Sequence, residues 1–212
     1  MASLQIIGIP QSNFTRIARM AALEKGVPYD FVVAPPHSPD VKAIHPAGKV
    51  PVMRHGDMEL FESRAISHYI DDHFPGPALT PRNPAGDAQV EQWISYHNSI
   101  IDPILIRKYV LAGYVFPKTP DKKPDRAVID EVQPALKREV EVLEHATASG
   151  HLVGGRFTLA DIYMTVTLAT ASRLPELGAL IKGSPNLSRY IDQHTARESF
   201  KATMPPPPPA KN

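Results

Sequence analysis

The residues of this chain whose types and spacing suggest binding chemistry are concentrated between positions 48 and 66. Two short strand-like runs, residues 52–54 and Met58–Phe61, flank a glycine-containing turn, a pattern that predicts an antiparallel hairpin. Pro51 stands directly before the first run and cannot donate a hydrogen bond to a sheet. We therefore expect the backbone of Val50 to stay available for an extended ligand such as a short peptide.

The exit of the predicted hairpin carries groups that suit the charged ends of a peptide. Ser63 begins a segment with helical apolar spacing, so its hydroxyl and the first amides of the helix can bind a carboxylate. Glu62, directly before it, supplies the negative charge that an ammonium group needs. One end of the hairpin thus offers an anion site, a cation partner and a backbone edge, which together match an α-amino acid within a peptide.

This ordered set of residues resembles the glutathione site of the soluble glutathione transferases, and the plant-type phi class is the most similar. The sequence has Lys49-Val50-Pro51 and then, after ten residues, Glu62-Ser63-Arg64-Ala65-Ile66. The resemblance implies that Pro51 is cis and that the Val50 backbone pairs with the cysteinyl part of glutathione. It also implies that Glu62 and Ser63 hold the γ-glutamyl group.

A bound glutathione thiol reacts only when something stabilises its thiolate near neutral pH, and Ser12 is the candidate catalytic residue. Ser12 lies between the first predicted strand and the first predicted helix, where its hydroxyl can donate to sulfur and the helix dipole adds positive potential. The spacing from Gly8 to Ser12 is similar to that of the phi-class glycine and catalytic serine. Two alternatives remain: Ser12 acts only as a helix N-cap, or the Asn13 amide donates to the sulfur instead.

The resemblance also implies further binding residues. Lys49 would bind the glycyl carboxylate or backbone oxygens of glutathione. His37 and Lys42 lie where the phi pattern has a His-Lys pair, although the loop here is shorter and rich in proline. An electrophile pocket is expected between the two domains, lined by Ile9, Pro10, Asn13, Phe14, Tyr96 and Ile100.

Composition argues against several other classes of function. The net charge is +1 with no basic stripe, so we expect neither nucleic acid nor a membrane surface as a partner. The chain has no cysteine, which removes thiolate nucleophiles, thiolate metal sites and the transferase relatives that use an active-site cysteine. Its nine histidines lack metal-ligand spacing, so no metal is expected. Without a long apolar run or a secretory-type start, a cytoplasmic protein is expected.

Apolar periodicity predicts an α/β domain followed by an all-α domain. Strands at 4–9 and 29–34, a helix between them, a weak helical turn at 41–44, the hairpin and a helix ending near His73 give the thioredoxin-like order β-α-β-α-β-β-α. The predicted organisation is a thioredoxin-like glutathione-binding domain (1–76), a linker (77–86), an all-helical bundle (87–204) and a proline-rich flexible tail (205–212).

Long helices are expected in the second domain at 88–114, 125–148 and 159–172. Pro103 and Pro134 fall inside two of them and are expected to kink or split the helices, since proline lacks a donor and clashes with the preceding turn. Thr158 and Asp161 have the spacing of a capping box before an apolar helical run.

The leading hypothesis is a glutathione transferase that conjugates the glutathione thiolate to small apolar electrophiles, and the family implies a homodimer. A noncatalytic transferase-like protein that binds glutathione or apolar ligands is the alternative from a different class. A glutathione-dependent isomerase or peroxidase on the same fold would use the same residues and differ only in the electrophile.

Overall fold

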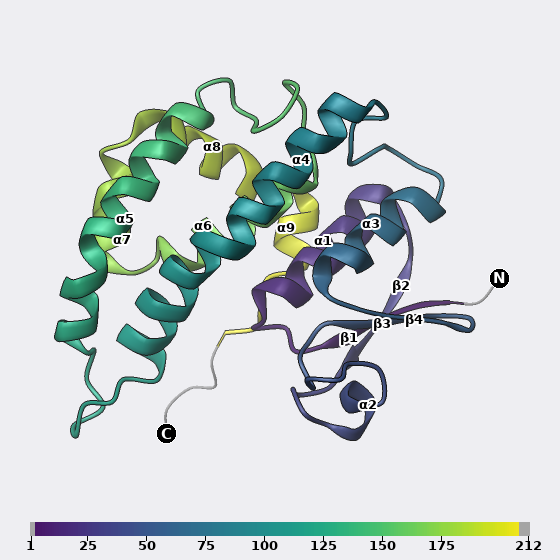
Figure 1. Ribbon diagram of the computed structural model, residues 1–212, viewed down its shortest axis with the longest axis horizontal. Helices are drawn as coiled ribbons and strands as arrows, with labels where there is room; N and C mark the ends of the chain where they lie inside the picture. Colours follow the sequence, from purple (N-terminus) through teal and green to yellow (C-terminus); the bar gives the residue numbers. More distant parts are fainter. Residues whose placement is uncertain (1–2, 208–212) are drawn as a thin grey trace. The chain divides into compact units, whose positions relative to one another are not determined.

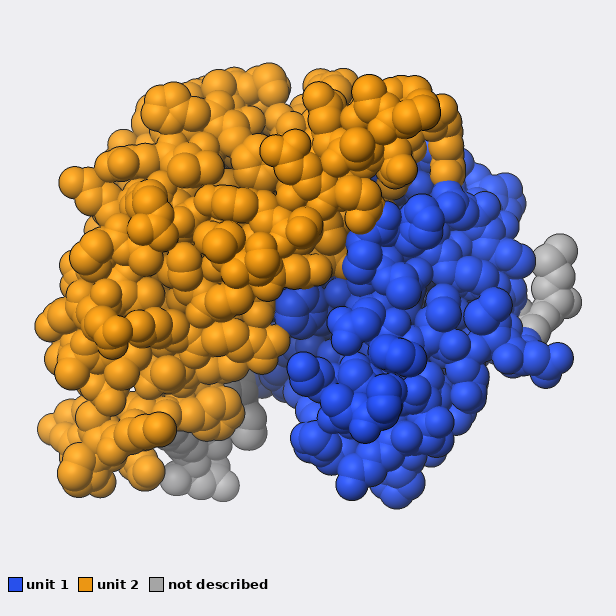
Figure 2. Space-filling model, in the orientation of Figure 1, with its two compact units in different colours: residues 1–79, 197–212 blue, residues 80–196 orange. Residues whose placement is uncertain are grey.

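The computed structural model describes residues 3–207, so most of the predicted tail at 205–212 lies outside the described residues. The chain divides into two compact units (Figures 1 and 2). Unit 1 takes its described residues from 1–79 and 197–212, and unit 2 is Thr80–Ala196. The unit that contains the candidate glutathione residues is therefore assembled from both ends of the chain.

Unit 1 is built on a four-stranded mixed sheet with the strand order β2-β1-β3-β4. The strands are β1 (Leu4–Gly8), β2 (Tyr29–Val33), β3 (Val52–His55) and β4 (Met58–Phe61). β1 runs parallel to β2 and antiparallel to β3, and β3 forms the predicted hairpin with β4. The expected thioredoxin-like sheet is confirmed.

Helices cover both faces of this sheet because neighbouring strand residues point to opposite sides. The helices are α1 (Asn13–Lys25), α2 (Pro39–Lys42) and α3 (Ser63–His73). On one face Ile6 packs in a core with Ala18 of α1 and Ile66 of α3. On the other face Ile7 packs with Val41 of α2. Figure 1 shows α1 and α3 on one side of the sheet and α2 on the other.

A buried ion pair fixes the C-terminal end of α1 to α3. The Lys25 Nζ atom lies 2.9 Å from Asp71 Oδ1, and both side chains are almost completely buried. The same oxygen accepts a hydrogen bond from the Leu79 amide at 2.8 Å. Gly76 allows the chain to pass this point, because a Cβ atom there would lie 2.2 Å from the Lys25 carbonyl oxygen.

The last helix of the chain, α9 (Glu198–Ala202), also belongs to unit 1, although the sequence pattern placed it in the helical domain at 87–204. The guanidinium of Arg197 donates to both carboxylate oxygens of Glu24 in α1, at 2.7 and 2.5 Å. The Ser199 hydroxyl donates to the same carboxylate. A charged, two-point contact of this kind fixes orientation as well as distance, so α9 is firmly attached to α1.

Unit 2 is helical, as predicted, and among the residues described it contains no strand longer than an isolated bridge. Its helices are α4 (Pro84–Tyr96), η1 (His97–Val115), α5 (Arg126–Ala146), α6 (Leu159–Ala171), α7 (Pro175–Lys182) and α8 (Pro185–Thr195). They bury one large apolar core, which includes Tyr109, Leu136 and Tyr190. Within residues 3–207, no helix is both long and apolar enough to cross a membrane.

Neither internal proline splits its helix, so that part of the expectation is wrong. Pro134 lies inside α5, which runs without a break. The buried face of α5 carries Ile129, Leu136 and Val140, and burial of such side chains outweighs the roughly 3 kcal/mol that an interior proline costs. Pro103 lies inside η1, a π-helix that directly continues α4 from His97 onward.

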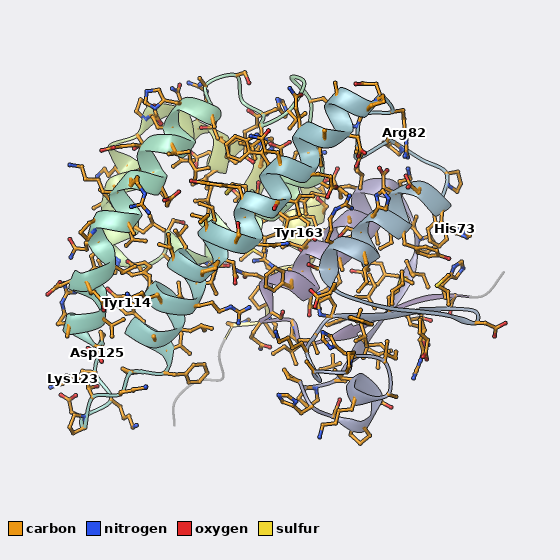
Figure 3. The ribbon with its side chains drawn as sticks, viewed as in Figure 1. His73, Arg82, Tyr114, Lys123, Asp125 and Tyr163 are labelled. Carbon is orange, nitrogen blue, oxygen red and sulfur yellow. The ribbon has the colours of Figure 1, made fainter. Side chains whose placement is uncertain are left out.

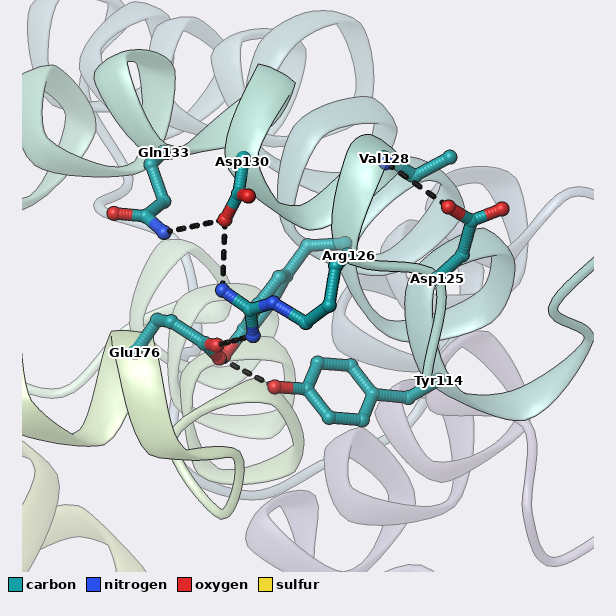
Figure 4. A network of polar contacts seen from close by, with 8 residues as sticks. Tyr114, Asp125, Arg126, Val128, Asp130, Gln133 and Glu176 are labelled. Atoms are coloured by element: carbon teal, nitrogen blue, oxygen red, sulfur yellow. Dashed lines mark hydrogen bonds and ion pairs between the residues drawn. The ribbon is translucent and has the colours of Figure 1, made fainter. Parts of the chain in front are cut away.

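A polar network joins three helices of unit 2 (Figure 4). The Glu176 carboxylate in α7 accepts hydrogen bonds from the hydroxyls of Tyr109 and Tyr114 in η1 and from Arg126 in α5. Arg126 also binds Asp130 at 2.7 Å. Burial by itself would raise the pKa of Glu176, but these donors outweigh it and lower that pKa to about 2. Glu176 is therefore held as a carboxylate.

Candidate functional site

The strand register brings the candidate residues of unit 1 to one end of the sheet. Ile7 of β1 pairs with Val52 of β3, and Val52 pairs with Phe61 of β4. The turn that carries Ser12 follows β1, Val50-Pro51 precede β3, and Glu62-Ser63 follow β4. Because these three strand ends lie in one row, three segments that are separate in the sequence meet at the same edge of unit 1.

Ser12 is the N-cap residue of α1. Its backbone is extended, with φ −75° and ψ 121°, and its Oγ accepts a hydrogen bond from the Thr15 amide at 3.3 Å. The Ser12 carbonyl accepts from the Arg16 amide at 2.9 Å. A hydroxyl group has one donor and two acceptor positions, so the cap uses an acceptor and leaves the O–H hydrogen available. Capping and donation to a ligand are therefore compatible.

The turn before α1 fits closely against the sheet because Gly8 has no side chain. A Cβ atom at Gly8 would lie 2.5 Å from the Thr15 hydroxyl oxygen. Asn13, the alternative donor to sulfur, is buried with 8% exposure, whereas Ser12 is half-buried. Ser12 is thus the more accessible of the two polar side chains at this turn.

The segment before β3 presents its backbone as expected. The Val50–Pro51 peptide bond is cis. In the described part of the chain, neither backbone group of Val50 has a hydrogen-bond partner. The exposed Lys49 side chain precedes it. The backbone edge proposed for an extended ligand is therefore open in this structure.

His37 lies beside this segment, and Lys42 lies further away along the loop. The His37 amide donates to the Gly48 carbonyl at 2.8 Å, and the His37 ring covers Gly48, where a Cβ atom would lie 2.4 Å from Nδ1. Both residues have positive φ angles. Lys42 is the exposed last residue of α2. The structure thus brings His37 against Gly48, the residue before Lys49, and it leaves Lys42 at the end of a one-turn helix.

Glu62 and Ser63 open α3 with an unusual backbone. Ser63 is the first helical residue and is buried, and Glu62 holds the N-cap position with φ 68°. A left-handed conformation is uncommon for a residue with a side chain, and such residues concentrate at functional sites. The Glu62 side chain makes no capping hydrogen bond and is 65% exposed. Its carboxylate therefore remains accessible to a cationic ligand group.

His45, which no sequence pattern indicated, contacts the Glu62 carboxylate. The His45 side chain is buried, and its Nε2 lies 3.5 Å from Glu62 Oε1. Its Nδ1 accepts a hydrogen bond from the Ala47 amide at 3.0 Å, so the ring proton belongs on Nε2, facing Glu62. The ring also packs 4.9 Å from the Phe61 ring, measured between centroids. A single histidine before a proline gives no pattern that could have indicated this role.

The candidate electrophile residues fall on both units. Ile9, Pro10 and Phe14 are half-buried around the turn before α1. In unit 2 the Tyr96 hydroxyl donates to the Glu139 carboxylate, and burial is the main factor that raises the pKa of Tyr96 to about 12. Tyr96 lines a groove of about 450 Å³ with Gln92, Trp93, Ser95, Ser99 and Val142. Ile100 is half-buried and is not among the residues that line this groove.

Histidines also gather at the opposite end of the hairpin. The rings of His55 and His73 lie 5.1 Å apart, and His55 Nδ1 is 2.9 Å from the Tyr69 hydroxyl. His73, labelled in Figure 3, ends α3. Among residues 3–207 no group of three or more metal-ligating side chains is found. These histidines form an aromatic cluster with Tyr69 and Phe74.

Comparison with known proteins identifies the class to which this fold and site belong. The model of the glutathione S-transferase N-terminal domain matches residues 6–78, and the model of the C-terminal domain matches residues 108–198. Glutathione S-transferase 3 of Zea mays is 31% identical over 98% of each chain. The chain therefore belongs to the glutathione S-transferase family.

Solved structures of glutathione transferases have the same fold as this chain. Glutathione transferase F7 from Populus trichocarpa superimposes with a TM-score of 0.82 at 25% identity, covering 94% of this chain and 97% of the other. A glutathione S-transferase of Methylobacillus flagellatus KT, solved with GSH bound, gives a TM-score of 0.79 at 25% identity, covering 96% of this chain and 100% of the other. The plant relatives are phi-class (F) transferases, as the resemblance of residues 48–66 indicated.

Proposed function

We propose that this chain is a transferase that joins the thiolate of glutathione to a small apolar electrophile. The observation that supports the proposal is the register of Ile7, Val52 and Phe61, because it brings the turn with Ser12, the backbone of Val50 and the carboxylate of Glu62 to one end of the sheet. The relative solved with GSH bound supports glutathione as the peptide.

In this proposal the glutathione peptide lies along the segment before β3. Its cysteinyl backbone pairs with the free amide and carbonyl of Val50, as in strand addition. The γ-glutamyl ammonium binds the exposed Glu62 carboxylate, and the γ-glutamyl carboxylate binds Ser63 at the N-terminus of α3. Lys49 and His37 bind the glycyl end, and Lys42 contributes from α2.

The proposed catalytic residue is Ser12. Its O–H donates to the thiolate while its oxygen caps α1, and the helix dipole adds positive potential at the same point. One hydrogen bond to a charged acceptor contributes about 1.5–3 kcal/mol, which corresponds to a thiol pKa lowered by about one to two units. The greater accessibility of Ser12 compared with Asn13 favours the hydroxyl as the donor.

The electrophile is proposed to contact Ile9, Pro10, Phe14 and the Asn13 backbone in unit 1. Tyr96 and Ile100 of unit 2 are proposed on the family resemblance alone. A homodimer, a cytoplasmic location and a role in the detoxification of electrophiles are likewise proposed from family membership.

Replacement of Ser12 tests the mechanism. Ser12→Ala should lower kcat/KM for glutathione conjugation by at least tenfold and abolish the thiolate absorbance of bound glutathione. Loss of the cap should also cost about 1 kcal/mol of stability. Asn83→Ala is the matched control, because Asn83 caps α4 through a 2.9 Å bond from the Gly86 amide and lies outside unit 1.

The control separates loss of a cap from loss of the thiolate donor. Asn83→Ala should show a similar fall in melting temperature with unchanged thiolate absorbance. Full activity in Ser12→Ala would remove Ser12 from the mechanism. Glutathione binding without a thiolate in the unmodified protein would favour the noncatalytic alternative.

A further inference from the structure

Arg16 is a charged residue of α1 that the proposed mechanism does not use. Its residue exposure is only 2%, which is rare for an arginine. Its backbone amide donates to the Ser12 carbonyl at 2.9 Å, so the two residues are one helical turn apart. Residues with this spacing lie on the same side of a helix, with Cβ atoms roughly 6 Å apart. A buried positive charge therefore accompanies the turn that carries Ser12.

The C-terminal helix α9 holds this charge in place. The Arg16 Nε atom donates to the Thr203 carbonyl at 3.1 Å, directly after α9. The guanidinium carbon lies 4.7 Å from the centroid of the Phe200 ring, within the range of a cation–π contact. The Arg197 and Ser199 contacts to Glu24 attach α9 to the same face of α1. Residues almost two hundred positions away in the sequence thus fix the Arg16 side chain.

We propose that Arg16 is a positioning residue of the thiolate site, and that α9 sets the thiol pKa by holding the Arg16 charge beside the first turn of α1. This inference rests on the proposed function. The charge acts through space, in addition to the Ser12 hydroxyl, because a positive charge in a partly buried position favours the ionised form of a nearby thiol. No bond to sulfur is required.

The C-terminal helix α9 therefore contributes to catalysis by positioning Arg16, in addition to stabilising unit 1. In a medium of intermediate dielectric constant, one charge near the start of α1 is expected to shift a thiol pKa by about 0.5 unit. Proton loss goes to solvent, and the thiolate remains paired with the Ser12 hydroxyl.

The test compares three variants by the pH profile of kcat/KM and by the pH dependence of thiolate absorbance of bound glutathione. Arg16→Gln should raise the apparent pKa by about 0.5 unit and lower kcat/KM about threefold below that pKa. Arg16→Lys retains the charge and should keep the apparent pKa near that of the unmodified protein, even if its melting temperature falls. Arg54→Gln removes one positive charge from the hairpin, where Arg54 pairs with Glu59, and is the control with an unchanged profile.

The outcomes separate this inference from the proposed function. Equal melting losses in Arg16→Gln and Arg16→Lys with no change in apparent pKa would show a purely structural role and overturn the inference. In that case Ser12→Ala still tests the thiolate mechanism independently. Absence of any thiolate in the unmodified protein would instead refute the proposed function itself.

Discussion

At the scale of single residues, the contacts of Glu62 determine how it can serve as a binding group. Its backbone is left-handed and its carboxylate is mostly exposed, so nothing in its own helix orients it. The Nε2–H of His45 faces that carboxylate, and the Ala47 amide fixes the tautomer. An oriented carboxylate loses less conformational entropy when it binds a cation, so His45 should contribute to affinity.

His45→Phe tests this contribution. The substitution keeps an aromatic ring against Phe61 and removes the nitrogen that faces Glu62. We expect KM for glutathione to rise about threefold to tenfold, in line with the loss of one charged contact, while kcat stays within about twofold. Steady-state kinetics at fixed pH measure both constants.

His68→Gln serves as the control, because His68 is exposed on α3 and contacts Asp72 instead. Its KM should match that of the unmodified protein. An unchanged KM in His45→Phe would mean that Glu62 needs no partner to bind glutathione.

At the scale of elements, the start of α6 is fixed by more than a local cap. Asp161 is buried, and its Oδ2 accepts from both the amide and the hydroxyl of Thr158, at 2.9 and 3.0 Å. Its Oδ1 accepts from the Leu152 amide at 2.9 Å and from the Tyr190 hydroxyl at 3.0 Å. The predicted capping box is confirmed, and it also ties the preceding loop and α8 to α6.

Asp161→Ala should therefore destabilise the protein much more than Thr158→Ala. The first change leaves several buried donors without an acceptor and should cost several kcal/mol, whereas loss of a cap hydroxyl costs about 1 kcal/mol. Denaturant unfolding of both variants gives the two values. Glutathione affinity should be unchanged in the variants that remain folded. Equal losses in the free energy of unfolding for the two variants would contradict the wider role of Asp161.

Local signals in the sequence predicted most of the helices and strands. They also predicted which segments carry the candidate site residues. Ser12 caps α1, as its position between the first predicted strand and helix indicated, and the left-handed Gly26 ends that helix; an N-cap hydroxyl and a left-handed glycine act within one turn. The partnership of Arg16 with Thr203 could not be predicted, because it depends on long-range packing. Of the two predicted effects of Pro134, a kink or a split, the split does not occur, because burial of the apolar face of α5 outweighs the local preference of proline.

At the scale of the whole molecule, the Glu176 network makes stability depend on acidity. The unfolded carboxyl titrates near 4.5, whereas the folded group has a pKa of about 2. Between these values the unfolded chain binds a proton that the folded chain does not, so the free energy of unfolding falls as pH drops from about 4.5 toward 2. Above pH 4.5 the full contribution is present.

Glu176→Gln should lower the melting temperature at pH 6, because the network loses its charge. It should also reduce the fall in melting temperature between pH 4.5 and pH 3. Calorimetry at pH 6, 4.5 and 3 measures both effects. Glu198→Gln changes an exposed residue of α9, and its melting temperature should depend on pH as in the unmodified protein. If the pH dependence of the melting temperature is unchanged in Glu176→Gln, other titrating groups cause the acid sensitivity.

The assembly of unit 1 from both ends of the chain has a consequence for biosynthesis. Residues up to Leu79 leave the ribosome first, but the helix that binds Glu24 and Arg16 is synthesised only after all of unit 2. At roughly 5–20 residues per second, this delay is on the order of ten seconds. One face of α1 in the nascent thioredoxin-like unit therefore stays uncovered until α9 has been synthesised after unit 2.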